Sequence, residues 1–205
     1  MTLPGLHLDD WRATKDTLHL YSQILGKIRL ATTTPRNHWW NAALYVDVRG
    51  LTTRRLHHRD TTFEITIDFV DHTLIARDGR TKSFDIGSGM PVADFDARIR
   101  AALSELGVDV NIEEEPFGVP TTTPFPHDVE HASWDREAIA RFARIIRTLE
   151  QRVRQGKHIR RPPEQMIVDR GVHHRPPHRR SGRLVRDRAN RVHVTARQAR
   201  RDEQG

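Results

Sequence analysis

The chain has 205 residues, of which 36% are hydrophobic and 30% charged, and it contains no cysteine. This length suits one domain with an appendage, and the lack of cysteine excludes a disulfide framework, a thiolate metal site and a cysteine nucleophile. The N-terminal residues do not follow the signal-peptide pattern, and no apolar stretch reaches the roughly 20 residues that cross a bilayer. We therefore expect a soluble, cytoplasmic protein with no membrane partner.

The formal charge of +7 is distributed unevenly along the chain. Residues 1–150 contain 18 Lys+Arg and 22 Asp+Glu, a net charge of −4, whereas residues 151–205 contain 16 and 5, a net charge of +11. All 4 Trp, 2 Tyr and 7 Phe lie between Trp11 and Phe142. Because a segment of low hydrophobicity and high charge cannot bury enough surface to fold, we expect a domain over residues 1–155 and a disordered, Arg/His/Pro-rich tail over residues 156–205.

The first predicted element is an amphipathic helix that ends before residues 32–35. Its apolar residues recur at steps of three, four or seven, which is the spacing of one buried helical face. They are Trp11, Leu18, Tyr21, Leu25 and Ile28.

From residue 43 the apolar period changes from 3.6 to two, which is typical of strands with one buried face. This alternation predicts strands over residues 43–50 and 63–69, and a further strand over residues 73–77. Asp78-Gly79 predicts a type I′ hairpin, because glycine accepts its positive φ. An antiparallel meander from about residue 43 to residue 87 follows.

The elements after the meander are two helices separated by irregular chain. A helix is predicted between Pro91 and Gly107, which suit the first turn and the left-handed cap. Alternation over residues 108–112 predicts a short strand, and the four prolines of residues 113–126 predict a loop. Ser133 or Asp135 caps a third amphipathic helix. The predicted fold class is α+β, an antiparallel β-meander packed against three amphipathic helices.

Several motifs between residues 8 and 149 occur in an order that is specific to one family. They include Asn37-His38-Trp39-Trp40, Leu44-Tyr45-Val46, Arg49-Gly50-Leu51-Thr52-Thr53, Asp68-Phe69-Val70-Asp71-His72 and His131-Ala132-Ser133-Trp134-Asp135. On these motifs the chain resembles the bacterial family catalogued as domain of unknown function 5996. The resemblance implies no activity and no site residues.

The chain departs from that family after its last predicted helix. The family pattern continues into an aromatic segment with a Pro-Val-His-Phe-Phe-Trp-Gly run, whereas this chain changes abruptly to Arg, Pro, His and Gly. An off-frame reading of a GC-rich gene gives this composition, because these residues have GC-rich codons. The sequence therefore favours a truncation or a frame shift near residue 150.

Two segments could form a small-molecule site. His38, Trp39 and Trp40 precede a strand, where two indole rings could stack on a planar or apolar ligand while the imidazole exchanges a proton. In the alternative, both Trp pack on the sheet and His38 bonds a backbone carbonyl.

The second segment is Asp68, Asp71 and His72, which could orient a base or contribute to a cation site. In the alternative, Asp71-His72 is simply a turn. A structural or protein-contact role predicts instead that His38 and His72 are buried, far apart and line no cavity.

The remaining motifs predict little chemistry. His127 and His131 have the spacing of a zinc-binding pair, but a surface loop is the favoured interpretation. The sequence has no phosphate-binding P-loop and no Gly-x-Ser-x-Gly motif. No metal, no cofactor and no reaction is therefore predicted, and whether the protein is an enzyme stays open.

The basic tail supports an alternative function, a non-catalytic nucleic-acid-binding module. Its arginines would neutralise phosphates in a non-specific and salt-dependent way. Without aromatic residues the tail could not recognise single strands by stacking. The residues that would carry this contact are Arg160, Arg161, Arg175, Arg179, Arg180 and Arg183.

Overall fold

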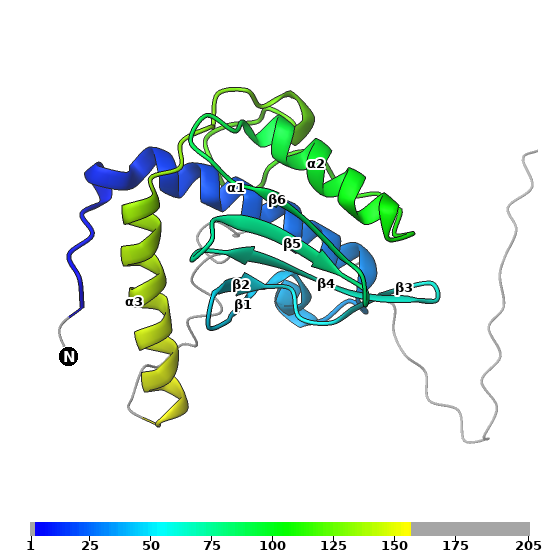
Figure 1. The fold of residues 1–205 in the computed structure, drawn as a ribbon, viewed down its shortest axis with the longest axis horizontal. Helices are drawn as coiled ribbons and strands as arrows, with labels where there is room; N and C mark the ends of the chain where they lie inside the picture. The colour runs from blue at the N-terminus through cyan, green and yellow to red at the C-terminus, as the bar shows by residue number, and fades with distance from the viewer. Residues whose placement is uncertain (1–2, 157–205) are drawn as a thin grey trace, which may run out of the picture. The chain divides into compact units, whose positions relative to one another are not determined.

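The computed structural model of the protein describes residues 3–156, and the tail expected over residues 156–205 lies outside this part from residue 157 onward. The described chain has an α+β fold, as the sequence predicts (Figure 1). Its helical elements are α1 (Leu8–Thr32), η1 (Asn37–Ala42), α2 (Val92–Glu105), η2 (Phe125–His127) and α3 (Arg136–Arg154). None of the described helices is long and apolar enough to span a membrane.

The strands form one antiparallel sheet of six strands. They are β1 (Tyr45–Val46), β2 (Gly50–Thr52), β3 (Leu56–His58), β4 (Thr61–Asp68), β5 (Thr73–Arg77) and β6 (Thr81–Asp85). The order across the sheet is β1-β2-β4-β5-β6, and β3 pairs with the first residues of β4. The predicted antiparallel meander is therefore confirmed.

The predicted strand over residues 43–50 is wrong in its extent, because the chain turns within it. Val48 lies in this turn and is 74% exposed. The N–H of Asp47 donates to the carbonyl oxygen of Gly50 over 2.9 Å, which starts β2 as a separate strand. Alternation alone could not reveal the turn, since Val48 continues the apolar pattern.

The predicted hairpin at Asp78-Gly79 is present, but its turn is not the expected type I′. Arg77 pairs with Thr81, so three residues rather than two form the loop. Gly79 has a φ of 109°, and the Asp78 carboxylate accepts the N–H of Arg80 over 2.9 Å. The carboxylate takes the place of a backbone carbonyl in closing the turn.

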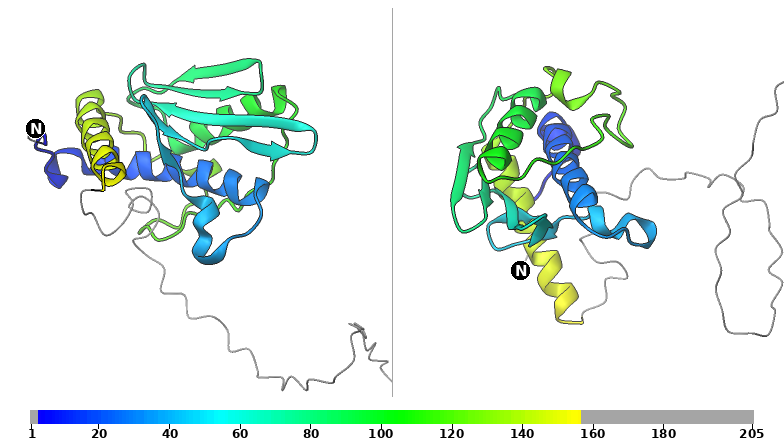
Figure 2. Two further views of the ribbon diagram at one scale, coloured as in Figure 1. Left: turned by 90° about the horizontal axis from the view of Figure 1, so that it is seen from below. Right: turned by 90° about the vertical axis from the view of Figure 1, so that its right-hand side faces the viewer.

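The core lies between one face of the sheet and the helices α1 and α2, which are on the same side of it (Figure 2). Phe63, Ile65 and Ile67 of β4 alternate toward this face and are fully buried. Between the two helices, the rings of Tyr21 and Phe95 stack with their centroids 3.8 Å apart. The helices α1 and α2 are thus held against each other as well as against the sheet.

Helix α3 lies at the end of the sheet where β4 turns into β5 (Figure 1). Asp135 is its N-cap, and its carboxylate accepts the N–H groups of Glu137 and Ala138. This satisfies two of the backbone donors that have no partner within a helix, so the predicted cap is confirmed.

The strand predicted over residues 108–112 is not formed. The apolar and polar residues of this segment still alternate between buried and exposed positions. Val108 and Ile112 are buried, whereas Asp109 and Asn111 are exposed. Gly107, with a φ of 78°, directs the chain along α1 and α2 instead of along a sheet edge. The segment therefore has no strand to pair with, and it lines a cavity.

Candidate functional site

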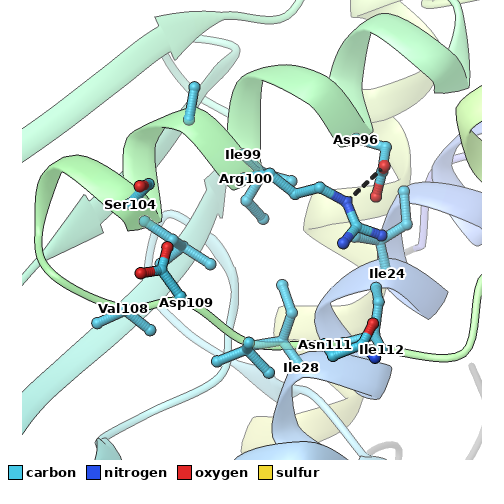
Figure 3. A pocket seen from close by; sticks show the side chains of 13 residues that line it. Ile24, Ile28, Asp96, Ile99, Arg100, Ser104, Val108, Asp109, Asn111 and Ile112 are labelled. Carbon is cyan, nitrogen blue, oxygen red and sulfur yellow. Dashed lines mark hydrogen bonds and ion pairs between the residues drawn. The ribbon is translucent and has the colours of Figure 1, made fainter.

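A cavity of about 540 Å³ lies between α1, α2 and residues 108–112 (Figure 3). Ile24 and Ile28 are four residues apart and therefore share one face of α1, and Ile99 of α2 faces them across the cavity. Ligand sites commonly have volumes of about 300–1,000 Å³ and mostly apolar walls with a few polar groups. The cavity has the size and the apolar wall of a small-molecule site.

The most buried polar group at this cavity is the carboxylate of Asp96, which is 2% exposed. Its Oδ2 accepts a hydrogen bond from Nε of Arg100 over 2.7 Å, one turn along α2. Its Oδ1 has no hydrogen-bond partner in the described protein. A buried polar atom left unpaired costs roughly 1–3 kcal/mol, so the cavity wall holds an acceptor that a donor from outside the protein would satisfy.

Carboxylates outnumber basic groups around this cavity. Asp109 lines it, and residues 113–115, all glutamate, line an adjoining hollow of about 440 Å³ that shares Asn111 and Ile112 with it. The guanidinium of Arg100 pairs with Asp96 and reaches Glu114 over 3.5 Å. The surroundings therefore favour a positively charged ligand over a negatively charged one.

His38, Trp39 and Trp40 lie in η1, and both indole rings are exposed, Trp39 at 66% and Trp40 at 56%. The alternative in which both Trp pack on the sheet is therefore wrong. His38 and Trp39 have φ values of 56° and 59°, a left-handed backbone that costs roughly 1–2 kcal/mol for each such residue. Neighbouring structure must hold this backbone in place, and strain of this kind often occurs at functional sites.

The loop is fixed at its C-terminal end by the buried Arg29 of α1. Its Nε donates to the carbonyl oxygen of Asn41 over 3.0 Å, and the Asn41 side chain donates to Thr33 over 3.2 Å. The guanidinium groups of Arg29 and Arg54 lie 5.0 Å and 3.7 Å from the ring centroid of Tyr45. A basic cluster therefore lies at the C-terminal end of the loop that carries the exposed tryptophans.

Asp68 and Asp71 are already bonded within the protein. Asp68 is 1% exposed, and its Oδ1 accepts the N–H groups of Val70 and Asp71 over 2.8 and 3.0 Å. Arg49 pairs with both carboxylates. Burial raises the pKa of Asp68, but the bonds from Arg49, Asp71 and Val70 outweigh it and hold this pKa below its ordinary value. These bonds stabilise the turn between β4 and β5.

The two predicted segments lie in different parts of the fold. His72 is buried near the start of α3, where its Nδ1 accepts the indole N–H of Trp134 over 3.2 Å. His38 is exposed in η1, which packs against α1 (Figure 1). Among the hydrogen bonds of residues 3–156, none joins His38, Trp39 or Trp40 to the turn.

The buried environment of His72 predicts a dependence of stability on pH. Burial and then the charge of Arg136 lower the pKa of His72 from its ordinary 6.5, against the opposite effect of Asp68 and Asp71. As the pH falls below 6.5, the unfolded chain therefore binds a proton before the folded protein does. The free energy of unfolding should decrease from this pH toward the folded-state pKa.

Chemical denaturation of the wild type and of His72→Asn between pH 7.5 and pH 5 measures this contribution. Asparagine tolerates the φ of 55° at position 72 and does not titrate in this range. The variant should lose less stability than the wild type over the same interval. Equal losses in the two proteins would contradict the assignment to His72.

Of the pair His127 and His131, His131 is bonded within the protein. Nδ1 of His131 bonds Oδ2 of the buried Asp128 over 2.8 Å, within the loop that precedes α3. Over residues 3–156, no cluster of three or more His, Cys, Asp or Glu side chains is arranged to hold a metal ion.

Asp96 and Arg100 are the residues that the sequence reasoning missed. The apolar stripe of the predicted second helix includes Val92, Phe95 and Ile99. Asp96 is four residues after Val92 and three before Ile99, so helical spacing places a carboxylate on the buried face. A charged residue on such a face is rare unless it is paired. This position of Asp96 within the apolar stripe is the sequence feature that could have identified it as a candidate site residue.

Comparison with known proteins agrees with the motifs in the sequence. The family described as a family of unknown function, DUF5996, matches residues 3–155, which include every described helix and strand. No curated protein and no solved structure matches the chain. The expected resemblance is confirmed.

Proposed function

The chain belongs to the family of unknown function DUF5996, and we propose that it binds a small molecule in the cavity between α1 and α2. The observation that carries this proposal is the Oδ1 atom of Asp96, buried at the cavity wall without a partner. A ligand whose hydrogen-bond donor reaches this atom would pair with the carboxylate.

The chemistry of the wall selects the class of ligand. Ile24, Ile28 and Ile99 are aliphatic and at most 3% exposed, so a flexible hydrocarbon chain would insert against them by shifting this part of the core. Within the described part of the chain, the Oδ1 atom of Asp96 lacks a hydrogen-bond donor. Because carboxylates outnumber basic groups around the cavity, a donor group with a positive charge is favoured. A linear alkylamine, with its ammonium group at Asp96 and its chain against the isoleucines, combines these properties.

The proposal is tested by titrating the full chain with hexylamine, hexanol and hexanoate in a calorimeter. Hexylamine should bind more tightly than hexanol, and hexanoate should not bind. Asp96→Asn keeps the shape of the side chain and removes its charge. Because hydrogen bonds to charged groups contribute about 1.5–3 kcal/mol, this variant should bind hexylamine at least about tenfold more weakly.

Asp94→Asn is the matched control, since Asp94 lies on the same helix but is exposed. It should bind hexylamine as the wild type does, and circular dichroism should show that both variants are folded. Equal affinity of the Asp96→Asn variant and the wild type for hexylamine would contradict the role of the carboxylate. Absence of binding by both the amine and the alcohol would contradict the cavity as a site.

The turn between β4 and β5 is not part of this cavity site. We propose that Asp68, Asp71 and His72 serve the turn between β4 and β5, because their polar atoms are bonded within the protein. Nucleic-acid binding through the arginines of residues 160–183 concerns a segment outside the described residues and stays a prediction. A cytoplasmic location likewise stays a prediction.

A further inference from the structure

Trp39 and Trp40 form an exposed aromatic surface that the fold does not use. Among the ring–ring and cation–π contacts of the described residues, none involves either indole. The backbone at His38 and Trp39 is left-handed, and the rings it carries are exposed to solvent. Arg29 of α1 holds the C-terminal end of this loop through its hydrogen bond to the carbonyl oxygen of Asn41. Exposed apolar surface on an ordered loop typically marks a contact with a ligand or a partner.

The charged groups beside this surface are basic. Arg36 precedes η1 and Arg54 stacks on Tyr45, and neither forms an ion pair with an acidic residue in the described part of the chain. Burial lowers the pKa of Arg29, and the nearby positive charges of Arg54 and Arg36 act in the same direction, whereas Tyr45 opposes them. Among the described residues, the arginines thus leave positive charge without a carboxylate partner at both ends of the loop that carries the two indole rings.

We propose that this surface, made of Trp39, Trp40, Arg36 and Arg54, binds a planar base that carries phosphate, as in a nucleotide. Indole rings stack on bases of any sequence, and a guanidinium group donates two parallel hydrogen bonds to phosphate oxygens. The surface is separate from the cavity between α1 and α2, which attracts the opposite charge. A free mononucleotide and a single strand present the same chemistry to it.

The test is a calorimetric titration of the full chain with AMP, with adenosine and with a six-residue single-stranded oligonucleotide. AMP should bind more tightly than adenosine, because only AMP carries the phosphate. The double variant Trp39→Ala/Trp40→Ala should bind AMP at least about tenfold more weakly. Arg54→Gln should weaken AMP binding and leave adenosine binding unchanged.

Matched controls use exposed residues elsewhere in the described chain. Phe117→Ala removes an exposed aromatic ring, and Arg77→Gln removes an exposed arginine. Both should bind AMP as the wild type does. An oligonucleotide that binds more tightly than AMP and loses this advantage in the double tryptophan variant would identify a strand as the source of the base. Equal binding of the two would identify the free nucleotide.

Three results would overturn the proposal. The first is a double tryptophan variant that binds AMP and the oligonucleotide as tightly as the wild type does. The second is binding of adenosine equal to that of AMP. The third is no binding of AMP together with sedimentation on phosphatidylglycerol vesicles that requires Trp39 and Trp40, since this would assign the surface to a lipid headgroup layer.

Discussion

Replacing Phe95 with alanine is expected to lower the free energy of unfolding by about 3–5 kcal/mol, the range for large-to-small substitutions of buried aromatic residues. The Phe95 ring is fully buried, stacks on Tyr21 and contacts Phe84 edge-on with the centroids 5.7 Å apart. Its removal leaves a cavity where α2 meets both α1 and the sheet. Urea denaturation followed by circular dichroism measures the change, and the midpoint of thermal unfolding should fall by about 6–20 °C.

Asp94→Ala is the control for this substitution, because Asp94 precedes Phe95 in α2 and points to solvent. It removes only a charge near the start of the helix, so a change below about 1 kcal/mol is expected. A Phe95→Ala variant no less stable than the Asp94→Ala variant would show that the stacked rings do not join the two helices.

Replacing Gly50 with alanine is expected to destabilise the fold by at least about 3 kcal/mol, the upper end of the usual range for overpacking. A Cβ atom at this position would lie 1.9 Å from the carbonyl oxygen of Ile67 and 3.1 Å from the backbone nitrogen of Phe69. These are backbone atoms of the paired strand β4 and of the residue just after it, and they cannot rotate away as a side chain could. The pairing of β2 with β4 would have to separate locally.

Gly87→Ala is the matched control, since a Cβ atom there would meet nothing within 4 Å. Its free energy of unfolding should stay within about 0.5 kcal/mol of the wild-type value. Comparing the two variants by urea denaturation separates the clash from the general effect of adding a methyl group. Equal stability of the two variants would contradict the close approach of β2 to β4.

The fold was predictable in segments where the apolar residues follow a single helical or strand spacing throughout. Leu18, Tyr21, Leu25 and Ile28 are all buried in α1, as their helical spacing predicts. The chain was harder to interpret where a local turn interrupts a continuous pattern, as at Val48. The short strand β3 was missed, because a three-residue strand with two histidines shows no clear alternation and depends on β4 for its pairing.

The candidate sites were predictable only in their residue types. The sequence singled out Trp39 and Trp40, but their exposure depends on a left-handed backbone that pattern analysis assigns to glycine rather than to histidine or tryptophan. Asp96 was visible as a charge within an apolar stripe. That one of its oxygens lacks a partner depends on the direction of Arg100 and on the path of residues 108–112, which are tertiary features.

We propose that the cavity between α1 and α2 binds an aliphatic amine. The most direct measurement is a methyl NMR titration of isoleucine-labelled protein with hexylamine. Binding in this cavity should shift the methyl signals of Ile24, Ile28 and Ile99 and bring their methyl protons into contact with the alkyl chain. Ile75 on the sheet and Ile146 on α3 should not shift, because neither lines the cavity. Unchanged cavity methyls at millimolar hexylamine, or shifts confined to Ile75 and Ile146, would contradict it.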